Sequence, residues 1–241
     1  MLSKTDNYKN STSALDLYAE IEDMTGVFDV APCLYQYYIQ TLSKHKWQSL
    51  LDIGCGSGLF LEQLSKEFPN RVVQGIDLSP QMVKKALKRG VKAKVTQLHK
   101  VTKKFDIVTA VFDMLNYISP KDLPYFLESV HKILNKDGLF LCDINSKFGF
   151  EEVANGSFIA EKDNRFLAID SEYYNEIYKA DFTLFKSNGE CYNKFQDRIY
   201  QFLHTKKSIE KYKIFKVVSS KPITLYLNRP DKYYLILKAI D

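Results

Sequence analysis

The stretch that most constrains the fold is residues 50–58, Leu-Leu-Asp-Ile-Gly-Cys-Gly-Ser-Gly, a short apolar run that ends in an acid and then breaks into alternating glycines. An amphipathic segment follows, with its apolar residues at Leu59, Phe60, Leu61, Leu64 and Phe68. An apolar run, a glycine-rich break and an amphipathic segment in this order predict a buried strand, a tight turn and a helix. In α/β sheets such a turn binds a cofactor.

From residue 49 the chain alternates between strand and helix patterns. Strands are expected at 49–53, 71–76, 92–96, 105–111 and 138–143, and helices at 58–67, 80–89 and 120–135. Ser79-Pro80 and Ser119-Pro120 each supply a helix-capping residue followed by proline at the first helical position. The alternation predicts an α/β fold with a doubly wound, mostly parallel sheet and helices on both faces.

After residue 145 the alternation stops. Residues 157–202 are rich in Tyr, Phe and Ile, and Asn188-Gly189 lies between two strand-like runs as a hairpin signal. We therefore expect an inserted antiparallel β-sheet. The chain should end with a weak helix and closing strands, at 205–212, 214–218, 223–228 and 233–240.

Before the first strand, a polar leader at 1–13 precedes two helical patterns at 14–21 and 31–46, the second with Pro32 near its start. Helices in this position have no place of their own in the sheet, so they are free to fold over the carboxyl ends of the strands as a lid. The predicted organisation is an N-terminal helical lid at 1–46, a core at 47–150 and 203–241, and an inserted β subdomain at 151–202.

The spacing of the glycines restricts the cofactor. They stand at Gly54, Gly56 and Gly58, and Leu59 occupies the place of the third glycine in the dinucleotide pattern, so the pyrophosphate-binding spacing is absent. Asp52, two positions before the first glycine, would repel a pyrophosphate but can face an ammonium group. Asp77 ends the next strand, where a carboxylate accepts hydrogen bonds from ribose hydroxyls. Together these features favour a nucleoside that carries positive charge.

Four stretches of this chain resemble one known family. Residues 50–58 and the later run Gly75-Ile76-Asp77-Leu78-Ser79-Pro80-Gln81-Met82 are similar to the first two motifs of class I, or Rossmann-like, S-adenosylmethionine-dependent methyltransferases. Residues 105–108 and 134–140 resemble the fourth and fifth strands of that family with their flanks. The resemblance covers about residues 47–145 and implies a seven-stranded sheet whose last strand is antiparallel. The sheet inserted after the fifth strand is placed as in the small-molecule N-methyltransferases that act on glycine and sugars.

The resemblance implies S-adenosylmethionine as cofactor and S-adenosylhomocysteine as product. An acid at the position of Asp77 holds the ribose, Leu78 flanks the adenine, and the glycine turn approaches the methionine part. The family often has a further Asp after the third strand, but this chain has Thr96-Gln97-Leu98, where Gln97 either offers its amide oxygen or is an exposed loop residue. The expected cofactor-binding residues are Asp52, Gly54, Cys55, Gly56, Gly58, Asp77, Leu78, Met82, Gln97 and Phe112.

Catalytic candidates follow the fourth strand, where residues 112–117 are similar to the Asp-x-x-Asn-Tyr stretch of family members that act mostly on small molecules. Methyl transfer from a sulfonium needs in-line alignment, exclusion of water and, for a protonated acceptor, a base; it requires no metal. Arg198 would suit an acidic group on the substrate. The candidates are Tyr18, Asp113, Asn116, Tyr117 and Arg198, with His204, Gln196 and Asp197 as further possibilities.

These observations predict a methyltransferase acting on N or O of a small molecule. One alternative is an RNA or protein methyltransferase, which would use the nine Lys and Arg residues between 78 and 105 and the lysines at 206, 207, 211, 213 and 216. The expected strand order places these two groups near opposite edges of the sheet, which argues against one continuous patch and so against nucleic acid as a partner. A further alternative is a partner protein that binds S-adenosylmethionine without catalysis.

The remaining composition adds limits on location. The four cysteines show no CxxC spacing and no nearby histidine, so we expect reduced, mostly buried thiols and no metal site. No apolar stretch approaches the roughly 20 residues that span a bilayer, and residues 1–13 lack the apolar core of a signal peptide. We therefore expect a cytoplasmic protein without membrane contact, and a dimer is possible.

Overall fold

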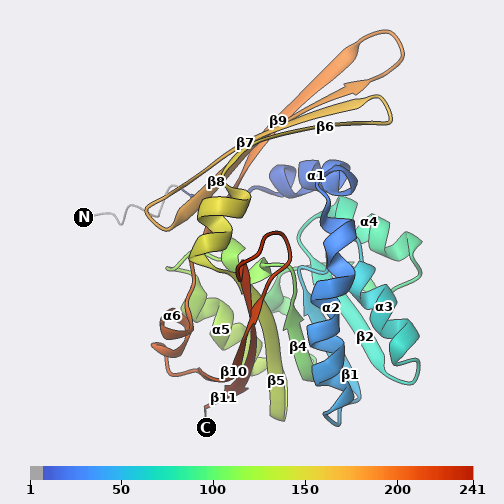
Figure 1. Cartoon of the computed structure of the whole chain (residues 1–241). Helices are drawn as coiled ribbons and strands as arrows, with labels where there is room; N and C mark the ends of the chain where they lie inside the picture. Colours follow the sequence, from blue (N-terminus) through green and yellow to red (C-terminus); the bar gives the residue numbers. More distant parts are fainter. Residues whose placement is uncertain (1–7, 241) are drawn as a thin grey trace.

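A seven-stranded sheet forms the centre of the computed structural model, which describes residues 8–240. Its strands are β1 Ser49–Ile53, β2 Val72–Asp77, β3 Ala93–Val95, β4 Phe105–Ala110, β5 Leu134–Asn145, β10 Phe215–Ile223 and β11 Lys232–Ala239. They lie in the order β10-β11-β5-β4-β1-β2-β3 (Figure 1). Strands β1 to β5 pair in parallel, whereas β11 is antiparallel to both of its neighbours. The predicted mostly parallel sheet with an antiparallel last strand is confirmed.

Helices cover both faces of this sheet, as predicted. They are α2 Val27–Ser43, α3 Leu59–Glu67, α4 Pro80–Lys88, α5 Leu123–Lys132 and α6 Lys206–Glu210. Successive side chains of a strand point to opposite faces, so Leu50 packs with α2 and α3 while Leu51 packs with α5. The two buried apolar layers fix the sheet and leave its carboxyl ends free to carry polar groups.

A second, four-stranded sheet follows β5, as expected for the insertion. It consists of β6 Gly156–Lys162, β7 Arg165–Tyr174, β8 Ile177–Ser187 and β9 Tyr192–Phe202, paired antiparallel in that order. The predicted Asn-Gly turn connects β8 and β9, where Gly189 has a positive φ of 97°. A π-helical segment over Gly149–Ala154 leads the chain from the strand ends into this sheet.

Helix α1, Thr12–Ile21, lies between the second sheet and α4 (Figure 1). Its apolar face packs on the second sheet, through Ala14, Leu17 and Ile21 against Leu167, Phe182, Leu184 and Ile199. Before α1, the Asn10 side-chain amide donates to the C=O of Tyr200 and accepts its N–H. The expectation that the polar leader is frayed is therefore wrong for residues 8–13. Residues 1–7 lie outside the described part of the chain.

Several predicted boundaries are wrong. The strand expected at 223–228 is a loop, because the Asp231 carboxylate accepts the N–H groups of Leu225 and Tyr226 and bends the chain there. Helix α2 begins at Val27, after Gly26 in a left-handed conformation with φ 74°, and it contains Pro32. The helix expected at 120–135 is shortened to Leu123–Lys132.

The cysteines are unpaired, and Cys33 and Cys191 are exposed whereas Cys55 and Cys142 are buried. The expectation of mostly buried thiols therefore fails for two of the four. Within residues 8–240, no helix is both long and apolar enough to cross a membrane.

Candidate active site

The glycine turn between β1 and α3 leaves one open face. Gly54, Gly56 and Gly58 all have positive φ, at 69°, 52° and 82°. A Cβ on Gly54 would lie 2.6 Å from the Cγ of Met114, and one on Gly58 would lie 2.8 Å from the Cγ2 of Val91, so these two positions are tightly packed. At Gly56 the nearest atoms are 4.0 Å away, namely Glu22 Oε1 and Met82 Sδ. The surface over Gly56 is therefore a cradle that any side chain would fill.

Asp77 stands beside this cradle at the end of β2. Its two carboxylate oxygens accept the N–H groups of Gly56 and Ser79, at 2.9 and 2.8 Å. Burial raises its pKa, and these backbone donors oppose that shift. A carboxylate offers about four acceptor positions, so Asp77 can still accept hydroxyl groups.

The other expected cofactor residues surround the same turn with different exposure. Leu78 and Gln97 are exposed near the ends of β2 and β3. Cys55 is buried and packs against Gly75, where a Cβ would lie 2.4 Å from that of Cys55. Phe112 is half-buried and makes an edge contact with Tyr35, with 6.2 Å between the ring centroids.

Asp52 lies beneath the turn rather than on its surface. It is 1% exposed, and the Thr109 hydroxyl donates to its Oδ1 at 2.7 Å. Burial is the main cause that raises its pKa, to about 7, and the negative charges of Asp77 and Asp143 act in the same direction.

Asp143 shapes the loop after β4, and the sequence reasoning missed it. Phe112 and Asp113 both have left-handed backbones, with φ of 58° and 50°, and both of their N–H groups donate to the Asp143 carboxylate at 2.8 Å. The Tyr38 hydroxyl donates to the same carboxylate at 2.6 Å. Its sequence signal was a charged residue inside the apolar run of β5.

This loop holds the Asp113 side chain at the strand ends between two donors. The Lys232 ammonium and the Gln201 amide both donate to its carboxylate. Lys232 is 3% exposed; burial opposes its charge, but Asp113 and Asp143 outweigh that effect and raise its pKa. Neither Lys232 nor Gln201 was expected from the sequence, because both come from strands far from Asp113 along the chain.

Four tyrosines gather around Asp113. Tyr18 of α1 and Tyr117 were expected, and the structure adds Tyr178 of β8 and Tyr226 of the loop between β10 and β11. Burial raises the pKa of each phenol, and the charge of Asp113 raises all four further. The phenols are therefore neutral near pH 7 and act as hydrogen-bond donors or acceptors.

Two expected catalytic residues do not fit that role. Asn116 is fully buried, and its amide donates to the Phe202 carbonyl and accepts the Asn145 N–H, at 2.8 and 2.9 Å. It ties the strand ends to β9, and its complete burial keeps it out of contact with the surface of the site. Arg198 points to the outer face of the second sheet, where it pairs with Asp181 at 2.5 Å, because its neighbour Ile199 faces inward.

The further candidates are likewise structural. His204 is buried against the Ile118 carbonyl, and burial lowers its pKa. Asp197 accepts a hydrogen bond from Ser13 at the start of α1, and the Gln196 amide donates to Thr183 on β8. Within residues 8–240, no group of three or more His, Cys, Asp and Glu side chains is arranged to hold a metal ion.

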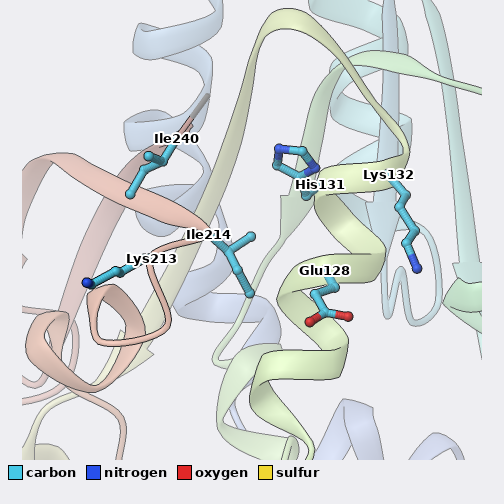
Figure 2. A pocket seen from close by; sticks show the side chains of 6 residues that line it. All are labelled: Glu128, His131, Lys132, Lys213, Ile214 and Ile240. Atoms are coloured by element: carbon cyan, nitrogen blue, oxygen red, sulfur yellow. The ribbon is translucent and has the colours of Figure 1, made fainter.

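Two surface hollows lie away from the strand ends. One, of about 280 Å³, opens between α5 and the end of the chain and is lined by Glu128, His131, Lys132, Lys213, Ile214 and Ile240 (Figure 2). Another, of about 260 Å³, lies between α2 and α3. Helix α1 and the second sheet, together called the cover, pack on each other, and α1 contacts α4 beside the site at the strand ends.

The comparisons with known proteins agree with this geometry. Residues 50–138 match a family model described as a methyltransferase domain. The putative methyltransferase YqeM of Bacillus subtilis is 28% identical over 162 residues, which are 61% of this chain and 64% of that protein. The malonyl-[acyl-carrier protein] O-methyltransferase of Bacillus cereus is 24% identical over 229 residues, 87% of this chain and 81% of that protein. The chain thus spans slightly less than two thirds of the length of the first of these relatives.

Solved structures share the whole fold. An S-adenosylmethionine-dependent methyltransferase from Clostridium acetobutylicum has a TM-score of 0.76 at 20% identity, covering 93% of this chain and 100% of that one. The sugar N-methyltransferase KedS8 from Streptoalloteichus has a TM-score of 0.70 at 16% identity, covering 98% of both chains. The chain therefore has the class I Rossmann-like fold of these structures, and its residues 50–138 match a methyltransferase domain. Since the likeness to KedS8 extends over nearly all residues, it includes α1 and the second sheet as well as the core.

Proposed function

We propose that this protein transfers a methyl group from S-adenosylmethionine to a nitrogen or oxygen of a small-molecule acceptor. The observation that carries the proposal is the convergence of two sites at the strand ends: the cradle of Gly56 beside Asp77, and the cluster of Asp113 with four tyrosines. Helix α1 borders both, which suits a reaction from which water must be excluded.

The residues of the cradle fit a cationic nucleoside. Asp77 keeps free acceptor positions for two ribose hydroxyls, Leu78 offers an apolar side chain to the base, and Gly56 allows close approach of the amino-acid part. Gln97 is exposed at the edge of this region and can accept from an exocyclic amine. When bound, the cofactor supplies a methyl group on a positively charged sulfur, and the surrounding acids stabilise that charge.

The acceptor side fits a polar small molecule, with an amine favoured over a hydroxyl. Lys232 and Gln201 fix the Asp113 carboxylate, so it can orient a hydrogen-bond donor of the acceptor molecule. Tyr18, Tyr117 and Tyr226 add neutral hydroxyl groups around it. Two structural neighbours are titled a sugar N-methyltransferase and an amino pentose methyltransferase, which supports an amino sugar as the first class to test.

A nucleic-acid acceptor is less well supported. The basic residues between 78 and 105 lie on α4, β3 and the segment after it, whereas the lysines at 206–216 lie on and beside α6 and β10. Since β3 and β10 are the two edges of the sheet, the groups form no continuous patch.

Calorimetric titration with S-adenosylhomocysteine tests the cofactor half of the proposal. We expect saturable binding by the wild-type protein, and Asp77→Asn should weaken it by about 1–3 kcal/mol, because charged acceptors of buried hydroxyls contribute that much. Asp137→Asn is the matched control, since Asp137 is exposed near the start of β5. Absence of binding to the wild type at millimolar ligand would refute the proposal.

Mass detection of transferred methyl groups tests the acceptor half. The wild-type protein and Asp113→Asn would be incubated with S-adenosylmethionine and a panel of amino sugars and their hydroxyl analogues. We expect a product from at least one amine, and a loss of kcat in Asp113→Asn with little change in the affinity for S-adenosylhomocysteine. Methylation of tRNA but of no small molecule would contradict the acceptor class.

A further inference from the structure

We infer that Glu22, contributed by the N-terminal segment, is the residue that binds the α-ammonium group of the cofactor's amino-acid end. This inference rests on the proposed function and adds to it a binding residue from outside the methyltransferase domain of residues 50–138. Glu22 begins the short 3₁₀ helix Glu22–Met24 that follows α1.

The Glu22 carboxylate is buried with one of its oxygens unpaired. The residue is 6% exposed, and its Oε1 accepts a hydrogen bond from the Ser57 hydroxyl at 2.8 Å. Its Oε2 has no hydrogen-bond partner among the described residues. The nearest cation is the Lys85 ammonium, which lies 3.9 Å away and donates to the Ala19 carbonyl instead. A buried acceptor without a donor costs free energy, so a ligand that supplies the donor would bind there.

The Glu22 carboxylate also lies beside the cradle over Gly56. Its Oε1, the oxygen that accepts the Ser57 hydroxyl, is 4.0 Å from the place where a Cβ of Gly56 would stand, and Met82 Sδ is equally far from that place. Glu22 and Met82 therefore both border the open cradle. The Gly56 N–H is bonded to Asp77, so a nucleoside whose ribose is held by Asp77 would lie beside this space, and we expect its amino-acid part to enter it.

The electrostatics of the cradle favour a cation over an anion. Burial raises the pKa of Tyr35, and the next causes are the negative charges of Asp52, Glu22 and Asp143, so three acids act on one point beside the turn. Lys85 is the described cation nearest to Glu22, and it is half-exposed and engaged elsewhere. An ammonium group placed in the cradle would meet Glu22 Oε1, which keeps a second acceptor position beside the Ser57 hydroxyl, while Oε2 of the same carboxylate has no hydrogen-bond partner among the described residues.

Asp23, the next residue, points away from the cradle and joins the N-terminal segment to the second sheet. Asp23 accepts two hydrogen bonds from Arg165 of β7, at 2.8 and 3.0 Å, and it pairs with Lys162 at 3.0 Å. Glu22 and Asp23 thus connect the cofactor cradle with the cover of the acceptor site. Cofactor binding through Glu22 would hold this cover in place.

The test compares three ligands on wild-type protein, Glu22→Gln and the control Glu20→Gln. S-Adenosylhomocysteine carries both the ammonium and the carboxylate, its decarboxylated amine carries only the ammonium, and methylthioadenosine carries neither. We expect Glu22→Gln to weaken the first two by about 10- to 100-fold, the usual range for a hydrogen bond to a charged group, and methylthioadenosine by less than twofold. Glu20 lies two residues earlier, near the end of α1, pairs with Lys186 of β8 and is half-exposed, so its variant should match the wild type.

Each other outcome overturns the inference. Equal weakening of all three ligands would mean that Glu22 acts through the fold of α1. Loss for S-adenosylhomocysteine alone, or tighter binding of it, would mean that Glu22 senses the carboxylate. Unchanged affinities in Glu22→Gln would remove the residue from the site. If the wild-type protein binds none of the three, the proposed function itself fails, and that result is separate from every result with the variant.

Discussion

At the scale of single residues, the strand ends hold an unusual number of buried acids. Glu22, Asp52 and Asp143 are each at most 6% exposed, and burial is the first cause that raises the pKa of all three. Lys232 is the buried cation beside Asp143, 3.6 Å from its Oδ2. Keeping carboxylates in such a place is unfavourable unless a positively charged ligand completes the set.

Burial of the Asp52 carboxylate makes the stability of the folded protein depend on pH. Its pKa is raised from 3.8 to about 7, so between these values the folded protein binds more protons than the unfolded chain. By linkage, stability then falls as the pH rises through this window. Asp52→Asn removes the effect, so the variant should gain roughly 2 kcal/mol relative to wild type between pH 5 and pH 8.

Urea unfolding at pH 5 and pH 8 measures this gain. Asp137→Asn serves as the control, because Asp137 is exposed and should shift neither curve. A difference between Asp52→Asn and wild type that is the same at both pH values would contradict the assignment of Asp52 as the titrating group.

Sequence reasoning worked for residues that belong to a local pattern and failed for their partners. Asp77 and the glycines could be predicted because a strand end and a turn are local features. The partners of Asp113 could not, since Gln201 and Lys232 lie 88 and 119 positions away from it along the chain. No periodicity indicates that a lysine in a closing strand meets an aspartate after the fourth strand.

At the scale of elements, α1 and the second sheet form one unit. They share an apolar cluster, and Arg165 of β7 donates to the Asp23 carboxylate and to the Glu20 carbonyl at 2.6 Å. The side chains of Arg165 and Asp23 are only 14% and 23% exposed, so water screens this pair little. Helix α1 is too short to be stable alone and depends on these contacts.

Arg165→Met should therefore loosen the N-terminal segment without unfolding the core. Loss of a largely buried bidentate pair costs about 1–3 kcal/mol, which corresponds to roughly 10- to 100-fold faster hydrogen exchange in residues 12–24. Mass spectrometry of peptides from α1 and from β4 measures both regions in one experiment. Arg71→Met, which removes a cation over the Trp47 ring far from α1, is the control.

Exchange that rises equally in α1 and β4 would show that Arg165 supports the whole fold. Unchanged exchange in α1 would show that the apolar cluster alone holds the helix on the sheet.

The order of the elements was predictable, but the faces of the second sheet were not. The core strands are continuous apolar runs between helices, and this pattern determines their place in a parallel sheet. In β9, both faces carry polar and aromatic residues, so the alternation has no clear phase. This is why Arg198 was expected inside the site, whereas the structure turns it outward and turns Gln201 inward.

At the scale of the whole molecule, the site is built from three distant parts of the chain and is closed by contacts to α4. Asp16 of α1 accepts the Ser79 hydroxyl and, at 3.3 Å, the Gln81 N–H, both at the start of α4. Lys85 of α4 donates to the Ala19 carbonyl. These contacts join the cover to α4, where we expect it to separate when ligands enter, whereas the Arg165 contacts lie within the cover.

Asp16→Ala should therefore open the cover more often. We expect both the association and the dissociation rates of S-adenosylhomocysteine to rise about 3- to 10-fold, because the contact stabilises the closed form with and without ligand. The dissociation constant should change less than threefold, since both rates move together. Stopped-flow fluorescence with the single Trp47 close to α2, or with a labelled ligand, follows both rates.

Glu20→Ala is the control variant for Asp16→Ala. Glu20 lies one turn further along α1 and pairs with Lys186 of the second sheet, so its loss weakens a contact within the cover. Unchanged rates in Glu20→Ala beside faster rates in Asp16→Ala would place the opening between α1 and α4. Faster rates in both variants would instead mean that α1 separates from the second sheet, and a slower dissociation in Asp16→Ala would rule out α1 as the cover of the cofactor.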